Sequence, residues 1–180
     1  HPVFREIIYE HIDLLINRPF LSFPGYGERT VAWSLHNTRV AYLLTGIPEL
    51  RVNANILIND MLSKMDRNTL WKAQPGANSH WMAGQFLAET GHWVEPTDNR
   101  RGKLTDGVNA LWSMIDWTSY NGHPRTPYRY PPDFSQSHPT THPALVSMPF
   151  RLMGEYAKEQ QILEKVDQHI GSNWGRVANQ

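Results

Sequence analysis

Apolar side chains recur at helical spacing along most of this chain, and that periodicity restricts the fold more than any other feature. Within residues 3–17 they lie three or four positions apart, which places them on one side of an amphipathic helix. The same spacing returns in residues 28–45, 48–65, 81–93, 104–119 and 143–170. No alternating run of β-branched residues extends beyond about four positions, the minimum for a strand. We therefore predict an all-α protein.

Residues 28–45 are apolar on more than one side of the predicted helix. Val31 and Leu35 lie on one face, and apolar residues on other sides are Ala32, Trp33, Val40, Leu43 and Leu44. A helix that is apolar all round is usually buried among other helices. We therefore expect this helix to be sandwiched in the interior, and Val52 and Ile56 to widen the buried side of the next helix.

Residues 143–170 predict one long helix. Its apolar stripe consists of Leu145, Met148, Leu152, Tyr156, Leu163, Val166 and Ile170. Proline disrupts helix interiors, so Pro149 is expected to kink this helix near its start or to mark where it begins.

Composition narrows the classes of function. Lys and Arg together number 17, as do Asp and Glu, so the charge gives no reason to expect binding to nucleic acid or an anionic membrane. The chain has no cysteine, which excludes disulfides, thiolate metal sites and a cysteine nucleophile. No apolar run approaches the roughly 18 residues of a spanning helix, so no membrane partner is expected. We expect a cytoplasmic protein, with a processed N-terminus at His1 as the alternative.

The segment 121–141 is set apart by its prolines and aromatic residues. Of the 13 prolines in the chain, those at 124, 127, 131, 132, 139, 143 and 149 fall between Pro124 and Pro149. This density forbids a continuous helix. The aromatic residues Tyr128, Tyr130 and Phe134 favour a loop that packs across the helices and covers a pocket.

A turn with the sequence LWKAQPGANS, at residues 70–79, separates two predicted helices. With MLSKM at 61–65 before it and LAET at 87–90 after it, this part of the chain resembles the opening of a DinB-like domain, the superfamily that includes YfiT-type enzymes. AWSLH at 32–36 and GEYAKEQQIL at 154–163 resemble two further stretches of that superfamily.

The resemblance implies a four-helix bundle that holds a divalent metal with three histidines. At the corresponding positions this chain has Gln85, Gly154 and Lys158. None of these replaces a histidine, and a lysine would repel a cation. The resemblance therefore implies a member that has lost the usual metal triad, and with it the basis for the family's enzymatic activities, including thiol transfer.

A substitute metal site is the alternative. Glu89 and His92 have the i, i+3 spacing that puts two ligands on one face of a helix. His138 and His142 lie four positions apart in the proline-rich region, and His36 is a further candidate. Together these residues could bind Zn, Ni or Fe. A solvated Glu–His pair and histidines in turns are the competing interpretation.

We therefore expect one helical domain over residues 1–180, with an N-terminal helix pair (1–46) and a DinB-like bundle (47–171) that carries the loop 121–141. Two function classes stay open. The first is a non-catalytic or small-ligand-binding protein, with homodimerisation as an added possibility. The second is a metal-dependent hydrolase or transferase that uses Glu89, His92, His138 and His142. The missing triad favours the first class.

Overall fold

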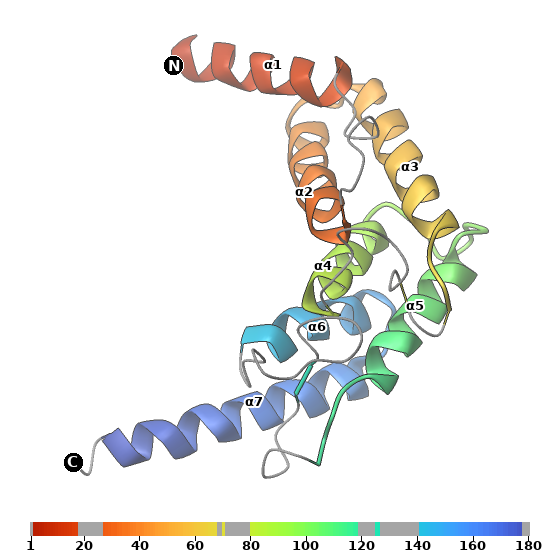
Figure 1. Cartoon of the computed structure of the whole chain (residues 1–180). Helices are drawn as coiled ribbons and strands as arrows, with labels where there is room; N and C mark the ends of the chain where they lie inside the picture. Colours follow the sequence, from red (N-terminus) through yellow and green to blue (C-terminus); the bar gives the residue numbers. More distant parts are fainter. Residues whose placement is uncertain are drawn as a thin grey trace.

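The structure, a computed structural model, describes residues 2–17, 27–67, 70, 80–118, 125–126 and 141–177. Within these ranges the helices are α1 (Pro2–Asn17), α2 (Glu28–Thr45), α3 (Pro48–Ser63), α4 (His80–Gly91), α5 (Arg101–Ser113), α6 (Thr141–Leu152) and α7 (Tyr156–Val177) (Figure 1). The only β pairing in the described ranges is two isolated bridges, Asp66 with Leu70 and Asp116 with Arg125. The all-α prediction is confirmed. None of the helices described is long and apolar enough to cross a membrane.

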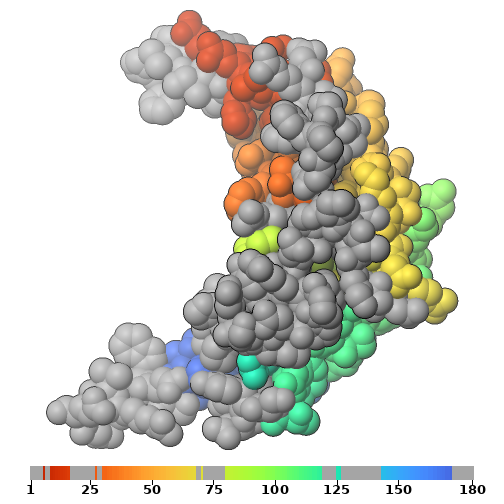
Figure 2. All heavy atoms as spheres, viewed as in Figure 1, coloured from red at the N-terminus to blue at the C-terminus, as the bar shows by residue number. Residues whose placement is uncertain are grey.

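The helices from α2 to α7 pair as antiparallel hairpins, and the hairpins stack in a curved row (Figure 1). Residues 46–47 join α2 to α3, residues 92–100 join α4 to α5, and residues 153–155 join α6 to α7. In the inner layer α4 contacts α2 on one side and α6 on the other. α1 packs against α2 and α3 at one end of the row. Figure 2 shows the atoms of α3 and α5 on the convex side of the arc.

The inner helices α2, α4 and α6 run in the same direction. Arg39, in the C-terminal half of α2, contacts Glu89 near the C-terminus of α4. Gly91, the last residue of α4, lies against Leu152, the last residue of α6; a Cβ added to Gly91 would be 3.2 Å from the Leu152 Cβ. The C-terminal ends of the three helices therefore gather on one side of the row, beside the hairpin turns.

The main core lies where α4 meets its neighbours. Phe86 and Leu87 of α4 are almost completely buried, as are Leu35 of α2, Leu111 of α5 and Phe150 of α6. On α5, Leu104, Val108 and Leu111 are buried, and so is Ile115 just after the helix. A smaller cluster of Ile12, Ala41 and Leu50 attaches α1 to the α2–α3 hairpin. Burial of this apolar area provides most of the driving force for folding.

Small residues allow α4 to approach its neighbours closely. A Cβ on Gly84 would lie 3.1 Å from the Cα of Val146, so the α4 and α6 backbones nearly touch there. On α5, a Cβ on Gly107 would lie 2.9 Å from both Leu87 Cδ2 and Met65 Sδ. A larger side chain at Gly84 would push against the α6 backbone, whereas one at Gly107 would require the Leu87 and Met65 side chains to move.

The prediction of one helix over residues 143–170 is wrong, because the chain breaks between α6 and α7. Gly154 has a φ of 80°, in the left-handed region that favours glycine. The amide of Glu155 donates to the carbonyl of Phe150 at 2.8 Å, the 6→1 bond of a Schellman motif. Pro149 lies inside α6 and does not end it. The predicted stripe changes accordingly: Met148, Tyr156 and Ile170 are exposed, while Val146, Phe150 and Ile162 are buried.

The prediction that α2 is sandwiched is also wrong. Val31, Ala32 and Leu35 are fully buried, but exposed apolar side chains on α2 are Trp33, Val40, Leu43 and Leu44. Val52 and Ile56 of α3 are likewise exposed. Val40 and Leu44 line an open groove of about 350 Å³ that α2 forms with α1. α5 ends at Ser113, earlier than the expected residue 119.

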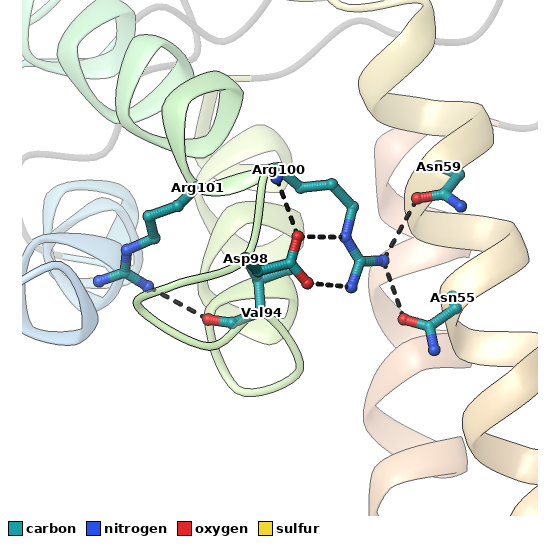
Figure 3. A network of polar contacts seen from close by, with 6 residues as sticks. All are labelled: Asn55, Asn59, Val94, Asp98, Arg100 and Arg101. Carbon is teal, nitrogen blue, oxygen red and sulfur yellow. Dashed lines mark hydrogen bonds and ion pairs between the residues drawn. The ribbon is translucent and has the colours of Figure 1, made fainter.

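A polar network fixes the turn between α4 and α5 (Figure 3). Asp98 accepts two hydrogen bonds from the Arg100 guanidinium, at 2.9 and 2.6 Å, and one from the Arg100 amide at 2.8 Å. The same guanidinium donates to Asn55 at 2.8 Å and to Asn59 at 3.2 Å on α3. The neighbouring Arg101 reaches the carbonyl of Leu152 at 3.1 Å. The turn is thereby tied both to α3 and to the end of α6.

Candidate functional site

A buried carboxylate lies at the seam between α2 and α4. Glu89 projects from α4 and is only 5 % exposed. Its Oε1 is 2.9 Å from Nδ1 of His36, and its Oε2 accepts a hydrogen bond from Nε of Arg39 at 3.0 Å. A buried carboxylate needs such partners, since burying an unpaired charge is strongly unfavourable.

The sequence places the two partners of Glu89 on one face of α2. His36 and Arg39 are three positions apart, so their side chains leave the helix on the same side. An ionised Glu89 accepts only, so the His36 nitrogen that faces it carries the proton. Arg39 neutralises the carboxylate, and its own positive charge is thereby balanced within the seam.

His92 follows Glu89 by one helical turn and extends the cluster. Partial burial lowers the pKa of its imidazole from the ordinary 6.5, and the positive charge of Arg39 adds to that effect. Glu89 acts in the opposite direction but does not reverse it. His92 is therefore neutral at pH 7, and its imidazole can both donate and accept a hydrogen bond.

A pocket of about 270 Å³ opens beside this cluster, where α2, α3 and the α4–α5 turn meet. Its lining residues are Arg39, Tyr42, Leu43, Arg51, His92, Trp93 and Glu95. The rings of Tyr42 and Trp93 contact each other with centroids 5.7 Å apart and supply an aromatic wall. The indole nitrogen of Trp93 is buried and has no hydrogen-bond partner among the described residues. The volume is slightly below that of a typical drug-sized site, which suits a small metabolite.

Opposite charges line this pocket without neutralising each other. Arg51 comes from the first turns of α3 and Glu95 from the turn after α4, and both are exposed. Neither side chain forms an ion pair with the other or with any other described residue. By contrast, Arg39 is already bound to Glu89. Arg51 and Glu95 are therefore the charges that this pocket presents to a ligand.

The structure brings together only part of the predicted metal site. Glu89 and His92 share α4, and His36 joins Glu89 from α2. His138 lies outside the described residues; His142 belongs to the first turn of α6, and its side chain is not described. Among the described residues no group of three or more His, Cys, Asp or Glu side chains is arranged to bind a metal ion.

The three residues that the sequence resemblance matches to histidines lie in different surroundings. Gln85 lies on α4, and Gly154 forms the left-handed turn before α7. Lys158 places its ammonium 5.6 Å from the centroid of the Trp112 ring, a cation–π contact. The proline-rich segment falls mostly outside the described residues, so its predicted place over a pocket stays a prediction.

Glu89, His92 and His36 were predicted from the sequence as metal ligands, whereas Arg39, Arg51 and Glu95 were not predicted as site residues. A local signal existed for Arg39, because it lies one turn after His36 on a helix that is otherwise largely apolar. No such signal existed for Arg51 and Glu95, since they come from separate elements and line the same pocket only because of tertiary packing. Comparison of the chain with protein-family models, with curated proteins and with solved structures gave no match.

Proposed function

We propose that this protein binds a small molecule carrying an anionic group, in the pocket between α2, α3 and the α4–α5 turn. The observation that supports this most directly is the Arg51 guanidinium, which lines a ligand-sized pocket and forms no ion pair with any described residue. A guanidinium presents a rigid fork of N–H donors that matches a carboxylate or a phosphate.

Other residues of the pocket suit the rest of such a ligand. Tyr42, Leu43 and Trp93 offer apolar and aromatic surface, while neutral His92 offers a hydrogen bond without adding charge. Arg39, which lines the pocket, is already held by its ion pair with Glu89, so this side chain needs little ordering on binding. For a ligand of this size we expect a Kd between about 10 µM and 1 mM, or about −4 to −7 kcal/mol.

Isothermal titration calorimetry with small carboxylates and inorganic phosphate tests the proposal. Arg51→Ala should weaken binding by about tenfold, and Arg51→Lys should restore only part of it, because lysine keeps the charge but loses the fork. Arg67→Ala removes an exposed arginine that does not line the pocket and serves as the matched control. Equal affinities for the parent and Arg51→Ala, or no binding of any probe, would contradict anion binding here.

A second candidate is a divalent-metal site at Glu89 and His92 with His36. It is favoured by the 2.9 Å contact between His36 and Glu89 and by the placement of His92 one turn later. Arg39 weighs against it, since its guanidinium already holds one oxygen of Glu89 and would repel a cation. Titration with Zn²⁺ or Ni²⁺, comparing the parent with His92→Ala, tests it. A stoichiometric metal that is lost in the variant would support the metal-dependent enzyme.

The relationship to DinB-like proteins stays a prediction based on the sequence motifs. Ligand binding at Arg51 does not depend on it. An alignment of related chains would test it by showing whether histidines replace Gln85, Gly154 and Lys158 in them.

A further inference from the structure

We propose that the ligand of this pocket is a zwitterion, with an anionic group bound by Arg51 and an ammonium group bound by Glu95. This inference rests on the proposed function and specifies its ligand class. It follows from the balance of charges around the pocket and from the hydrogen bonds that join the turn carrying Glu95 to the helix carrying Arg51.

The charges of the pocket sum to zero but remain separated. Glu89 cancels Arg39 within the seam, and His92 is neutral at pH 7. This leaves one positive charge on Arg51 and one negative charge on Glu95, which line the same pocket without forming an ion pair. A simple anion would gain attraction from Arg51 but would also meet repulsion from Glu95. A ligand with both charges gains from each of them.

The polar network of Figure 3 ties the turn that carries Glu95 to the helix that carries Arg51. Arg51, Asn55 and Asn59 follow one another at intervals of four, so they share one face of α3. Arg100 is hydrogen-bonded to both asparagines and to Asp98. The amide of Asp98 in turn donates to the carbonyl of Glu95 at 3.0 Å. Arg100 thus anchors the turn that carries Glu95 to the helix that carries Arg51, and it acts as a positioning residue.

Phenylalanine, 3-phenylpropionate and 2-phenylethylamine give the sharpest test, because the first differs from each of the others by one charged group. The phenyl ring suits the wall of Tyr42 and Trp93. We expect the parent protein to bind phenylalanine about 3- to 10-fold more tightly than 3-phenylpropionate. The reason is the added ion pair between the ammonium group of phenylalanine and the exposed carboxylate of Glu95. Glu95→Gln should abolish that preference without weakening 3-phenylpropionate, whereas Arg51→Ala should weaken both carboxylates.

The outcomes separate this inference from the proposed function. If 3-phenylpropionate binds as tightly as phenylalanine, or if Glu95→Gln keeps the preference, the zwitterion is excluded while anion binding stands. β-Alanine and propionate repeat the comparison for ligands too small to reach the aromatic wall. If no member of either set binds the parent protein, the zwitterion is overturned, and if inorganic phosphate also fails to bind, so is the anion site.

Discussion

Oε2 of Glu89 accepts a hydrogen bond from Nε of Arg39 at 3.0 Å, and this contact joins the C-terminal halves of α2 and α4. Glu89→Gln keeps the shape of the side chain but removes its charge, so Arg39 loses its ionic partner. We expect the free energy of unfolding to fall by about 1–3 kcal/mol. Urea unfolding should show a lower midpoint at an unchanged m-value.

The control for this prediction is Asp60→Asn, which removes the exposed ion pair between Asp60 of α3 and Lys64, the residue after that helix. Pairs at the surface contribute little, so this variant should lose less than about 1 kcal/mol. If both variants lose the same free energy of unfolding, burial does not strengthen the contact between Arg39 and Glu89.

The stability provided by Asp98 should depend on pH. Its hydrogen bonds from Arg100 lower the pKa of the carboxyl from the ordinary 3.8 to about 2. Because the folded-state pKa is the lower one, the stabilisation is fully present above about pH 4 and is lost as the pH falls towards 2. The difference in unfolding free energy between the parent and Asp98→Asn should therefore be constant from pH 5 to 7 and shrink in acid. A difference that does not change down to pH 2 would contradict the assignment.

Two leucines on α2 should respond very differently to truncation. Leu35 is fully buried in the main core, whereas Leu44 is 70 % exposed. Leu35→Ala leaves a cavity and should cost about 2–5 kcal/mol. Leu44→Ala removes a side chain that is already in solvent and should change stability by no more than about 0.5 kcal/mol. A large loss for Leu44→Ala would mean that this exposed face of α2 is covered in solution.

Gly84 should resist substitution although it lies inside a helix. Alanine normally favours a helix interior over glycine by about 1 kcal/mol. At Gly84, however, the added Cβ would meet the backbone of Val146 at 3.1 Å, so Gly84→Ala should destabilise the protein by about 1–3 kcal/mol. A Cβ added to Gly171 of α7 would meet no described atom within 4 Å, and Gly171→Ala should be neutral or stabilising. Thermal unfolding followed by circular dichroism measures both.

The helices could be predicted because their signals are local. Apolar spacing marks each helix, and two local signals mark the boundary between α2 and α3: Gly46 in the left-handed conformation after α2, and Pro48 in the first turn of α3. The break at Gly154 was missed because apolar residues continue at helical spacing on both sides of it. The exposure of Trp33 and Leu43 was missed for another reason: periodicity shows that a face is apolar, but it does not show whether anything packs against it.

In the candidate site, too, contacts within one helix could be predicted from the sequence, while contacts between helices could not. Glu89 and His92 share one helix, so their proximity follows from their spacing in the sequence. The contact of Glu89 with Arg39, and the meeting of Arg51 with Glu95, depend on how separate hairpins stack. Side chains that meet through tertiary packing leave no periodic trace in a single sequence.

The position of α4 has a consequence for how the molecule comes apart. Along the inner layer α2 contacts α4 and α4 contacts α6, so α4 and its hairpin partner α5 carry the packing between the two ends of the row. In such linear arrays fraying begins at the termini and works inward. Amide protons of α4 should accordingly be among the last to exchange with deuterium, and a lesion that melts α4 would uncouple the N-terminal half of the protein from the C-terminal half.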